Sequence, residues 1–424
     1  MKFKDLNIIQ PILQALEQKG YETPTPIQEA AIPVVLNGED LLGCAQTGTG
    51  KTAAFSIPII QQLVEREQER GNQHVIRSLI VTPTRELAIQ IGENIQEYSR
   101  NTNLKHTVVF GGVNQNSQVR AIRAGVDILI ATPGRLLDLM NQGFIKIQHV
   151  EIFVLDEADR MLDMGFINDI KKLLKVLPKQ RQSLFFSATM PKSIVELSNT
   201  ILNKPKKIEI SRVSSAAETV TQKIYYTNKD SKKALLYHIL EAEEITQVLV
   251  FSRTKHGADR IAQQLGKKDI QAAAIHGDKA QNYRQKVLSD FKDGKLRVLV
   301  ATDIAARGID IDKLAHVINY DIPDEPETYV HRIGRCGRAG ETGVAISMCE
   351  PEENKLTKEI EFLINKDLIP VKNHPFPQTE KPMNAAEKKE FNKEKARRKQ
   401  AFFADRKKND SGGGRQGGGG NRRR

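Results

Sequence analysis

Short apolar runs alternate with longer amphipathic stretches through the first half of the chain. The runs lie at Leu41–Cys44, Leu79–Thr82, Thr107–Phe110, Ile128–Thr132, Ile152–Leu155 and Ser183–Ser187. They are mostly unbroken by polar positions, as strands buried on both faces require. Because the stretches between them have helical patterns, the sequence predicts βαβ units and a parallel sheet.

The same pattern restarts after a polar boundary at residues 203–216. The second set of runs lies at Val248–Ser252, Ala272–His276, Val298–Thr302, Val317–Tyr320 and Val344–Met348. A chain of 424 residues is also too long for one typical domain. We therefore predict two similar α/β domains with a cleft between them.

The N-terminal segment precedes the first strand. Ile12 and Leu16 lie on one face of an expected amphipathic helix that ends near Gly20. Two prolines in Gly20–Gln28 favour a stiff, extended turn that would fix the positions of Tyr21 and Gln28. A Gln amide can both donate to and accept from the edge of adenine. Taken alone, however, the segment fits a connection between two helices better than a base reader.

The C-terminal end carries most of the net charge of +12. Residues 381–424 hold 15 Lys and Arg against 5 Asp and Glu, whereas the rest of the chain holds 49 against 47. The regular pattern fades beyond Val371, Lys388–Lys399 has the composition of a basic helix, and the Gly- and Arg-rich residues 411–424 are expected to be disordered. Such a tail either binds a polyanion, most often a nucleic acid, or only aids solubility.

The three cysteines, Cys44, Cys336 and Cys349, have neither metal-ligand nor paired spacing. This usage is typical of a reducing compartment. No run approaches the ~18 apolar residues of a membrane span, and the N-terminus has no apolar signal region. We therefore expect a cytoplasmic protein without a membrane partner.

The segment Ala45–Thr52, AQTGTGKT, matches the P-loop pattern with alanine at the first glycine position. It follows an expected strand and opens an expected helix, which is the context that such a site needs. Gly48 and Gly50 would let backbone N–H groups surround phosphate oxygens. Lys51 would neutralise the β- and γ-phosphates, and Thr52 would hold Mg²⁺.

Charged side chains follow several of the other strands, at the sheet edge where ligands bind in α/β proteins. Asp156 and Glu157 end a buried strand, so Asp156 would hold Mg²⁺ directly or through water and Glu157 would activate or orient the attacking water. In the second half, Arg335 and Arg338 would suit phosphate oxygens. They would either complete the nucleotide site from the second domain or form a basic surface for nucleic acid.

Residues Asp156–Asp159 read Asp-Glu-Ala-Asp, and the flanking segments resemble the motif set of the DEAD-box RNA helicases in order. The matching segments are Phe3 with Gly20–Gln28, Ala45–Thr52, Pro83–Ala88, Gly111–Gly112, Thr132–Arg135, Ser187–Thr189, Val250–Arg253, Thr302–Asp310 and His331–Arg338. The resemblance covers about residues 1–370. Cys336 stands where threonine is more usual, and the Gly/Arg-rich end resembles the bacterial RhlE-type branch.

The resemblance implies a Q-motif segment at 1–29 and two RecA-like domains at 30–204 and 217–370. A linker at 205–216 would join the domains, and a disordered basic tail would occupy 371–424. It also implies ATP and Mg²⁺ as cofactors. The nucleotide-binding residues would be Tyr21, Gln28, Ala45, Gln46, Thr47, Gly48, Thr49, Gly50, Lys51, Thr52, Asp156 and Asp310, with Phe3 as a second candidate for the wall beside adenine.

The other roles also come from the resemblance. Lys51, Glu157, His331, Arg335 and Arg338 would be catalytic, with the last two as arginine fingers. Ser187 and Thr189 would couple hydrolysis to RNA remodelling. RNA contacts would come from Thr84, Arg85, Gly112, Thr132, Arg135, Arg253, Gly277 and Thr302.

These roles predict a helicase that binds single-stranded RNA with low sequence preference and unwinds short duplexes when ATP closes the two domains. Ribosome assembly, cold adaptation and RNA decay all fit as its pathway. Two alternatives stay open: an RNA clamp with incidental turnover, and a DNA helicase or translocase. The presence of Glu157 and both arginines argues against the clamp, and the Gln28 segment with Asp156–Asp159 favours RNA.

Overall fold

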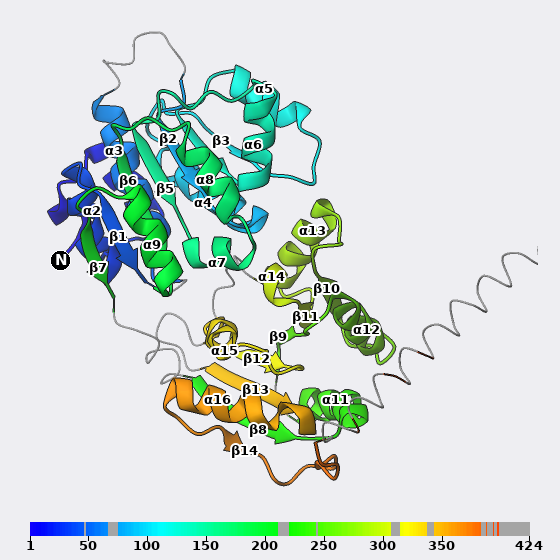
Figure 1. Cartoon of the computed structure of the whole chain (residues 1–424). Helices are drawn as coiled ribbons and strands as arrows, with labels where there is room; N and C mark the ends of the chain where they lie inside the picture. The colour runs from blue at the N-terminus through cyan, green and yellow to red at the C-terminus, as the bar shows by residue number, and fades with distance from the viewer. Residues whose placement is uncertain are drawn as a thin grey trace, which may run out of the picture.

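The computed structural model describes residues 1–45, 48–66, 75–210, 220–242, 245–306, 314–336 and 343–382, with single positions at 387, 393 and 397. The described residues form two seven-stranded sheets whose strand pairs are all parallel. Figure 1 shows them as two separate bodies, one blue to green and the other green to orange. The predicted pair of parallel α/β domains is therefore confirmed.

The first sheet has the strand order β3-β4-β2-β5-β6-β1-β7. Its strands are β1 (Leu41–Cys44), β2 (Ser78–Val81), β3 (His106–Val109), β4 (Ile128–Ala131), β5 (Ile152–Leu155), β6 (Gln182–Ser187) and β7 (Lys206–Glu209). One face is covered by α1 (Gln10–Gln18), α2 (Pro26–Leu36), α3 (Lys51–Glu65) and α4 (Arg85–Tyr98). The other is covered by α5 (Asn116–Arg123), α6 (Pro133–Asn141), α7 (Ala158–Asp163), α8 (Ile167–Leu174) and α9 (Lys192–Ile201).

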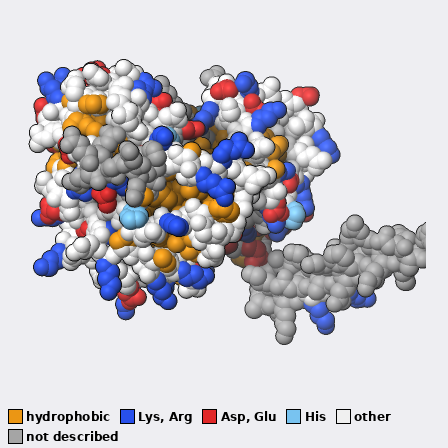
Figure 2. All heavy atoms as spheres, turned by 90° about the horizontal axis from the view of Figure 1, so that it is seen from above, with side chains coloured by type: hydrophobic (Ala, Val, Ile, Leu, Met, Phe, Trp, Pro, Cys, Tyr) orange, Lys and Arg blue, Asp and Glu red, His pale blue; other side chains and the backbone are white. Residues whose placement is uncertain are grey.

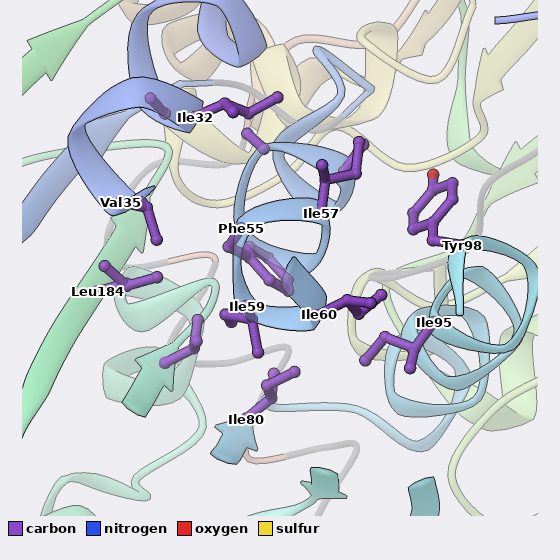
Figure 3. Packing of buried hydrophobic residues seen from close by; sticks show 14 of the residues in the cluster. Ile32, Val35, Phe55, Ile57, Ile59, Ile60, Ile80, Ile95, Tyr98 and Leu184 are labelled. Carbon is purple, nitrogen blue, oxygen red and sulfur yellow. The ribbon is translucent and has the colours of Figure 1, made fainter. Parts of the chain in front are cut away.

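Strand β5 shows why the strands read as unbroken apolar runs. Ile152 and Val154 pack into the core on the α3 side, whereas Phe153 and Leu155 pack into the core on the α8 side. Both faces of the strand are thus removed from water, which leaves no position for a polar side chain. Figure 3 shows the α3-side core, where Phe55 lies beside Ile59.

The second sheet repeats the same arrangement as β10-β11-β9-β12-β13-β8-β14. Its strands are β8 (Val220–Tyr226), β9 (Val248–Phe251), β10 (Ala272–Ile275), β11 (Val298–Ala301), β12 (His316–Asn319), β13 (Gly343–Cys349) and β14 (Ile369–Pro370). Helices α11 (Lys232–Ala242) and α12 (Lys255–Gly266) cover one face. The other is covered by α13 (Gln281–Lys292), α14 (Asp303–Ala306), α15 (Pro326–Ile333) and α16 (Asn354–Ile364).

The structure differs from the expected boundaries at two places. The expected linker at 205–216 begins with β7, which pairs with β1, and residues 211–216 of it lie outside the described residues. The expected tail at 371–424 begins with a segment that lies along β8, because Val371 N donates to Ile224 O at 2.9 Å and Gln378 N donates to Tyr226 O at 3.0 Å. Most of the expected helix at Lys388–Lys399, and all of 411–424, lie outside the described residues.

The surface of the two bodies agrees with their small net charge. Lys and Arg side chains are interspersed with Asp and Glu on the face shown in Figure 2. Within the described part of the chain, no helix combines the length and hydrophobicity that crossing a membrane requires.

Candidate nucleotide and RNA sites

The P-loop connects β1 to α3. Gly50 is the N-cap of α3 with φ 92°, and Gly48 has φ 85°, so both take backbone conformations that favour glycine. Helix α3 begins at Lys51, whose buried Nζ donates to Ala45 O at 2.7 Å. The loop therefore holds its lysine folded back over its own backbone. Gln46 and Thr47 lie outside the described residues.

A cavity of about 500 Å³ lies beside this loop. Its lining includes the predicted nucleotide residues Tyr21, Gln28, Gly48, Gly50, Lys51, Thr52, Asp156 and Glu157. Leu87, Gln90, Asn94 and Tyr98 of α4 complete one wall. The structure thus brings together residues that lie more than a hundred positions apart in the sequence.

Gln28 joins the N-terminal segment to the P-loop. It is the third residue of α2 and forms a capping box with Thr25, whose backbone N donates to Gln28 Oε1 at 2.9 Å. Gln28 Nε2 donates to Gly50 O at 3.1 Å, and Thr25 Oγ1 donates to Thr49 O at 2.8 Å. A Cβ atom at Gly50 would collide with the Gln28 amide. The segment is therefore a helix connection that also braces the P-loop.

The two aromatic candidates for the base end of the cavity differ in position. Tyr21 lies in the lining, 6.3 Å between ring centroids from Tyr98. Phe3 is buried in the core of the first domain and is not among the lining residues. The structure therefore favours Tyr21 as the aromatic wall.

Asp156 and Glu157 lie at the end of β5 with both carboxylates buried. Glu157 is the N-cap of α7 and has φ 53° and ψ 50°, a left-handed conformation that is costly for a residue with a Cβ. Its Oε2 pairs with Arg160 Nη1 at 2.7 Å, and its backbone N donates to Asp156 Oδ1 at 3.0 Å. The buried Arg160 therefore fixes the orientation of the Glu157 carboxylate.

The two neighbouring carboxylates have opposite pKa shifts. Burial raises the pKa of Asp156 to about 6, with a further contribution from the charge of Glu157 and against the charge of Lys51. Burial alone would also raise the pKa of Glu157, but Arg160, Lys51 and Arg335 hold it below its usual value. Glu157 is thus ionised at neutral pH, as a residue that orients or deprotonates water must be.

Asp159, the second residue of α7, links the carboxylates to the end of β6. Its Oδ2 accepts from Thr189 N at 2.9 Å, from Thr189 Oγ1 at 3.0 Å and from Ala188 N at 3.1 Å. Ser187 Oγ donates to Thr189 O at 2.7 Å. The two predicted coupling residues are therefore held by the same short helix that Glu157 begins.

The second domain contributes the segment His331–Arg338, which holds the predicted arginines and which we call the arginine segment. Arg335 is buried, its Nε donates to His331 O at 3.2 Å, and both side chains lie in a small cavity that includes Arg160 of the first domain. Arg335 and Arg160 line this cavity together, and Arg160 pairs with Glu157 at 2.7 Å, so Arg335 lies near Glu157 across the domain boundary. Arg338 and Asp310 lie outside the described residues.

A second cavity, of about 440 Å³, also lies between the domains, and we call it the interdomain groove. The predicted RNA residues in its lining are Thr84, Arg85, Thr132, Arg135 and Gly277. Gly112 lies against the Arg85 guanidinium, where a Cβ atom would collide with it. Arg284 of the second domain adds a third guanidinium. The carboxylates of Glu86 and Asp138 also line the groove, and the arginines outnumber them by one. Guanidinium groups in a groove are of the kind that bind a phosphate backbone.

Three predicted RNA residues, Gly112, Arg253 and Thr302, are not in the lining of this groove, although Gly112 contacts Arg85 there. Arg253 pairs through Nη2 with Glu353 at 2.5 Å and donates to Ile322 O at 2.9 Å. Thr302 is half-buried at the end of β11, where its backbone N donates to Ile275 O at 3.4 Å. Their contact with RNA stays a prediction.

Three residues that the sequence analysis missed join the domains beside the groove. Glu86 Oε2 pairs with Arg284 Nη2 at 2.9 Å, and Gln281 Nε2 donates to Glu86 Oε1 at 3.0 Å. Arg85 Nη1 donates to Gln281 Oε1 at 3.3 Å. We call Glu86, Gln281 and Arg284 the interdomain clasp. The only sequence signal was the i, i+3 spacing of Gln281 and Arg284 in a helix that follows Gly277.

Comparisons with known proteins agree with this geometry. A family model described as DEAD/DEAH box helicase matches residues 25–197, and one described as helicase conserved C-terminal domain matches residues 231–340. The chain is 42% identical over 370 residues to the ATP-dependent RNA helicase CshA of Listeria monocytogenes, which covers 87% of this chain and 70% of that protein. It is 42% identical over 375 residues to the DEAD-box ATP-dependent RNA helicase RhpA of Helicobacter pylori, at 88% and 75% coverage.

Solved structures give the same result. Saccharomyces cerevisiae Dbp5 bound to RNA and ADP BeF3 is similar with a TM-score of 0.76 and 29% identity, covering 87% of this chain and 95% of that one. Mss116p bound to single-stranded RNA and AMP-PNP is similar with a TM-score of 0.78 and 28% identity, at 88% and 79% coverage. The expected pair of RecA-like domains is therefore confirmed, whereas the RhlE-type branch stays a prediction. The chain belongs to the DEAD/DEAH box helicase family.

Proposed function

We propose that this chain is an ATP-dependent RNA helicase that binds single-stranded RNA with little sequence preference and unwinds short duplexes by ATP-driven closure of its two domains. The observation that carries the proposal is that residues of both domains meet at both sites. Arg335 of the second domain lines a small cavity with Arg160, the partner of Glu157 in the first, and Arg284 closes the groove that Arg85 and Arg135 line. Closure would thus complete the hydrolytic site and the RNA site together.

The residues present fit ATP with Mg²⁺. Among the described residues, no group of three or more His, Cys, Asp or Glu could hold a metal by itself. A magnesium ion that arrives with a nucleotide needs only one or two protein oxygens besides the phosphates and water. Thr52 and Asp156 line the same cavity and would supply them, while Lys51 would neutralise phosphate oxygens. The magnesium ion would neutralise charge on the phosphates, and its own charge would keep Asp156 ionised.

The residues around Glu157 would carry out hydrolysis. Glu157 would orient a water molecule and accept its proton, because Arg160 fixes its carboxylate and its pKa is low. Arg335 would approach the γ-phosphate on closure and Arg338 would join it, with His331 beside them. Gln28 would read adenine with the donor and acceptor capacity that its bonds to Thr25 and Gly50 leave free. Asp310 would contact the ribose.

RNA would be held mainly through its backbone. The guanidinium groups of Arg85 and Arg135 suit phosphates, and Thr84 and Thr132 line the same groove. Gly112, Gly277, Arg253 and Thr302 would add further contacts. Because backbone contacts carry no sequence information, specificity should be low. The tail would add salt-sensitive affinity.

Ser187 and Thr189 would couple the two activities. Asp159 holds Thr189 and lies within one turn of Glu157, so the segment would respond to the state of the catalytic carboxylate. A cytoplasmic location, and partners in ribosome assembly or RNA decay, are further predictions of the same proposal.

Steady-state ATP hydrolysis tests the proposal when measured without nucleic acid, with single-stranded RNA and with single-stranded DNA. We expect strong stimulation by RNA alone, and we expect Glu157→Gln to bind ATP but not turn it over. Equal stimulation by DNA would favour a translocase. No stimulation, together with intact ATP-dependent RNA binding, would favour a clamp. A thermal melt of Glu157→Gln controls for unfolding, since the change removes the partner of a buried arginine.

A further inference from the structure

Besides Pro83, three apolar side chains line the interdomain groove. Met164 and Phe166 belong to the first domain, and Ile304 belongs to the second. We call them the apolar groove patch. Apolar side chains add nothing to the binding of phosphates, so the three guanidinium groups do not explain their presence. The patch therefore needs a separate explanation.

The first-domain side of the patch is held in place by the end of α7. Gly165 has φ 78°, and its N donates to Leu162 O at 3.0 Å, which ends the helix. Phe166 N donates to Met161 O at 2.9 Å, and the Phe166 ring packs partly against the core. This is a glycine C-cap with its usual hydrophobic contact. The turn therefore fixes Met164 and Phe166 at the groove wall.

The second-domain side of the patch is unusually exposed. Ile304 is 57% exposed, although it lies three residues after the buried strand β11 and beside buried Ala305. Its neighbour Asp303 is fixed by Arg332, whose Nε lies 2.6 Å from Asp303 Oδ1. Exposed apolar surface is unfavourable in water and becomes favourable when a ligand covers it. Ile304 thus stands at the groove on a rigid support.

We propose that Met164, Phe166 and Ile304 contact the ribose and base faces of the bound RNA strand and supply the salt-independent part of its affinity. The inference rests on the proposed RNA-binding function of the groove. When arginines hold the phosphates of a strand, its other side presents sugar C–H groups and base faces. Such contacts are apolar and tolerate any sequence, because every base has an apolar face.

The patch is also close in the chain to the hydrolytic residues. Helix α7 has Glu157 at its start and Met164 at its end, and Asp303 beside Ile304 pairs with Arg332 in the arginine segment. RNA that covers the patch would therefore contact α7 and α14, two short helices that are connected to the catalytic groups. Loss of the apolar groove patch should therefore raise the RNA concentration needed to stimulate ATP hydrolysis.

Ile304→Ser tests the patch, because an exposed side chain can be changed with little risk to folding. The matched control is Val176→Ser, which changes a side chain that is 56% exposed and lies outside the groove lining. RNA affinity is measured with the full chain, a non-hydrolysable ATP analogue and a single-stranded RNA at several salt concentrations. Ile304→Ser should bind about three- to tenfold more weakly at every salt concentration, with an unchanged slope of log K against log salt. Ile304→Leu should retain the affinity.

Arg135→Ala separates this inference from the proposed function. It should weaken binding and reduce the slope by about 0.7, as expected for one lost phosphate contact on a single strand. If Arg135→Ala behaves so and Ile304→Ser binds like the control, the patch is overturned and the groove stands. If Ile304→Ser changes the slope of log K against log salt, the affinity that it removes is salt-dependent, and the apolar contact is also overturned. If Arg135→Ala has no effect on affinity or slope, the groove itself is not the RNA site.

Discussion

Removing the Arg284 side chain tests whether the interdomain clasp stabilises the closed state. Arg284 pairs with Glu86 at 2.9 Å, and the two side chains are only 8% and 6% exposed. Both would be solvated when the domains separate, so Arg284→Ala changes the closed state far more than the open one. A hydrogen bond to a charged group contributes about 1.5–3 kcal/mol, and Glu86 keeps its bond from Gln281. Closure should therefore become about 10- to 150-fold less favourable.

The assay is the RNA concentration that gives half-maximal stimulation of ATP hydrolysis. That RNA concentration should rise, at most by the same factor by which closure becomes less favourable. The thermal stability of the separate domains should not change. Glu86→Ala and the double variant complete a thermodynamic cycle, in which the two changes should not be additive. Lys355→Ala, which breaks an exposed pair with Glu359 in the second domain, is the control and should have no effect. Additive effects within about 0.5 kcal/mol would refute the clasp.

Four further changes test other parts of the molecule. Gln28→Ala should weaken ATP binding more than GTP binding, and equal losses in a competition assay would remove its role in reading adenine. Arg160→Gln should lower kcat with little change in KM for ATP, because Arg160 orients Glu157; a change confined to KM would count against that role. Deleting residues 381–424 should weaken RNA binding and flatten its salt dependence, and an unchanged slope would leave the tail as a solubilising segment. Burial and the charge of His238 lower the pKa of His374, so the unfolded chain binds more protons there and stability should fall as the pH drops below about 6.5. His374→Leu should reduce the loss of stability between pH 7.5 and 5.5, measured by urea unfolding. An unchanged loss would show that His374 is not its source.

The sequence predicted strands best where both faces of a strand are buried. The apolar runs at β5 and β9 coincide with the observed strands to within one residue. Strand β7 was missed because it is an edge strand in which Lys206, Lys207 and Glu209 are exposed, so it has no apolar run. Strand β14 has only two residues, both exposed, and gave no signal for the same reason.

The site was predictable where its groups are adjacent in sequence. The P-loop and the Asp156–Glu157 pair each form one contiguous motif, and the structure places both in one cavity. The pairing of Glu86 with Arg284 spans 198 positions and depends on how the domains meet, which no local pattern encodes. Likewise, Glu353 lies one hundred positions after Arg253, so the ion pair between them could not be predicted from the sequence. Motifs whose residues are adjacent in the sequence could thus be predicted, whereas ion pairs between distant residues could not.

The two cavities share their walls in a way that ties ATP binding to RNA binding. Helix α4 places Arg85 and Glu86 at the groove and Leu87 and Tyr98 at the nucleotide cavity. The second domain also takes part at both sites, since it supplies Arg284 to the groove and places Arg335 in a small cavity with Arg160, the partner of Glu157. A ligand that favours the closed state at one site must favour binding at the other by the same factor. Closure is therefore the two-state element through which each ligand raises the affinity for the other.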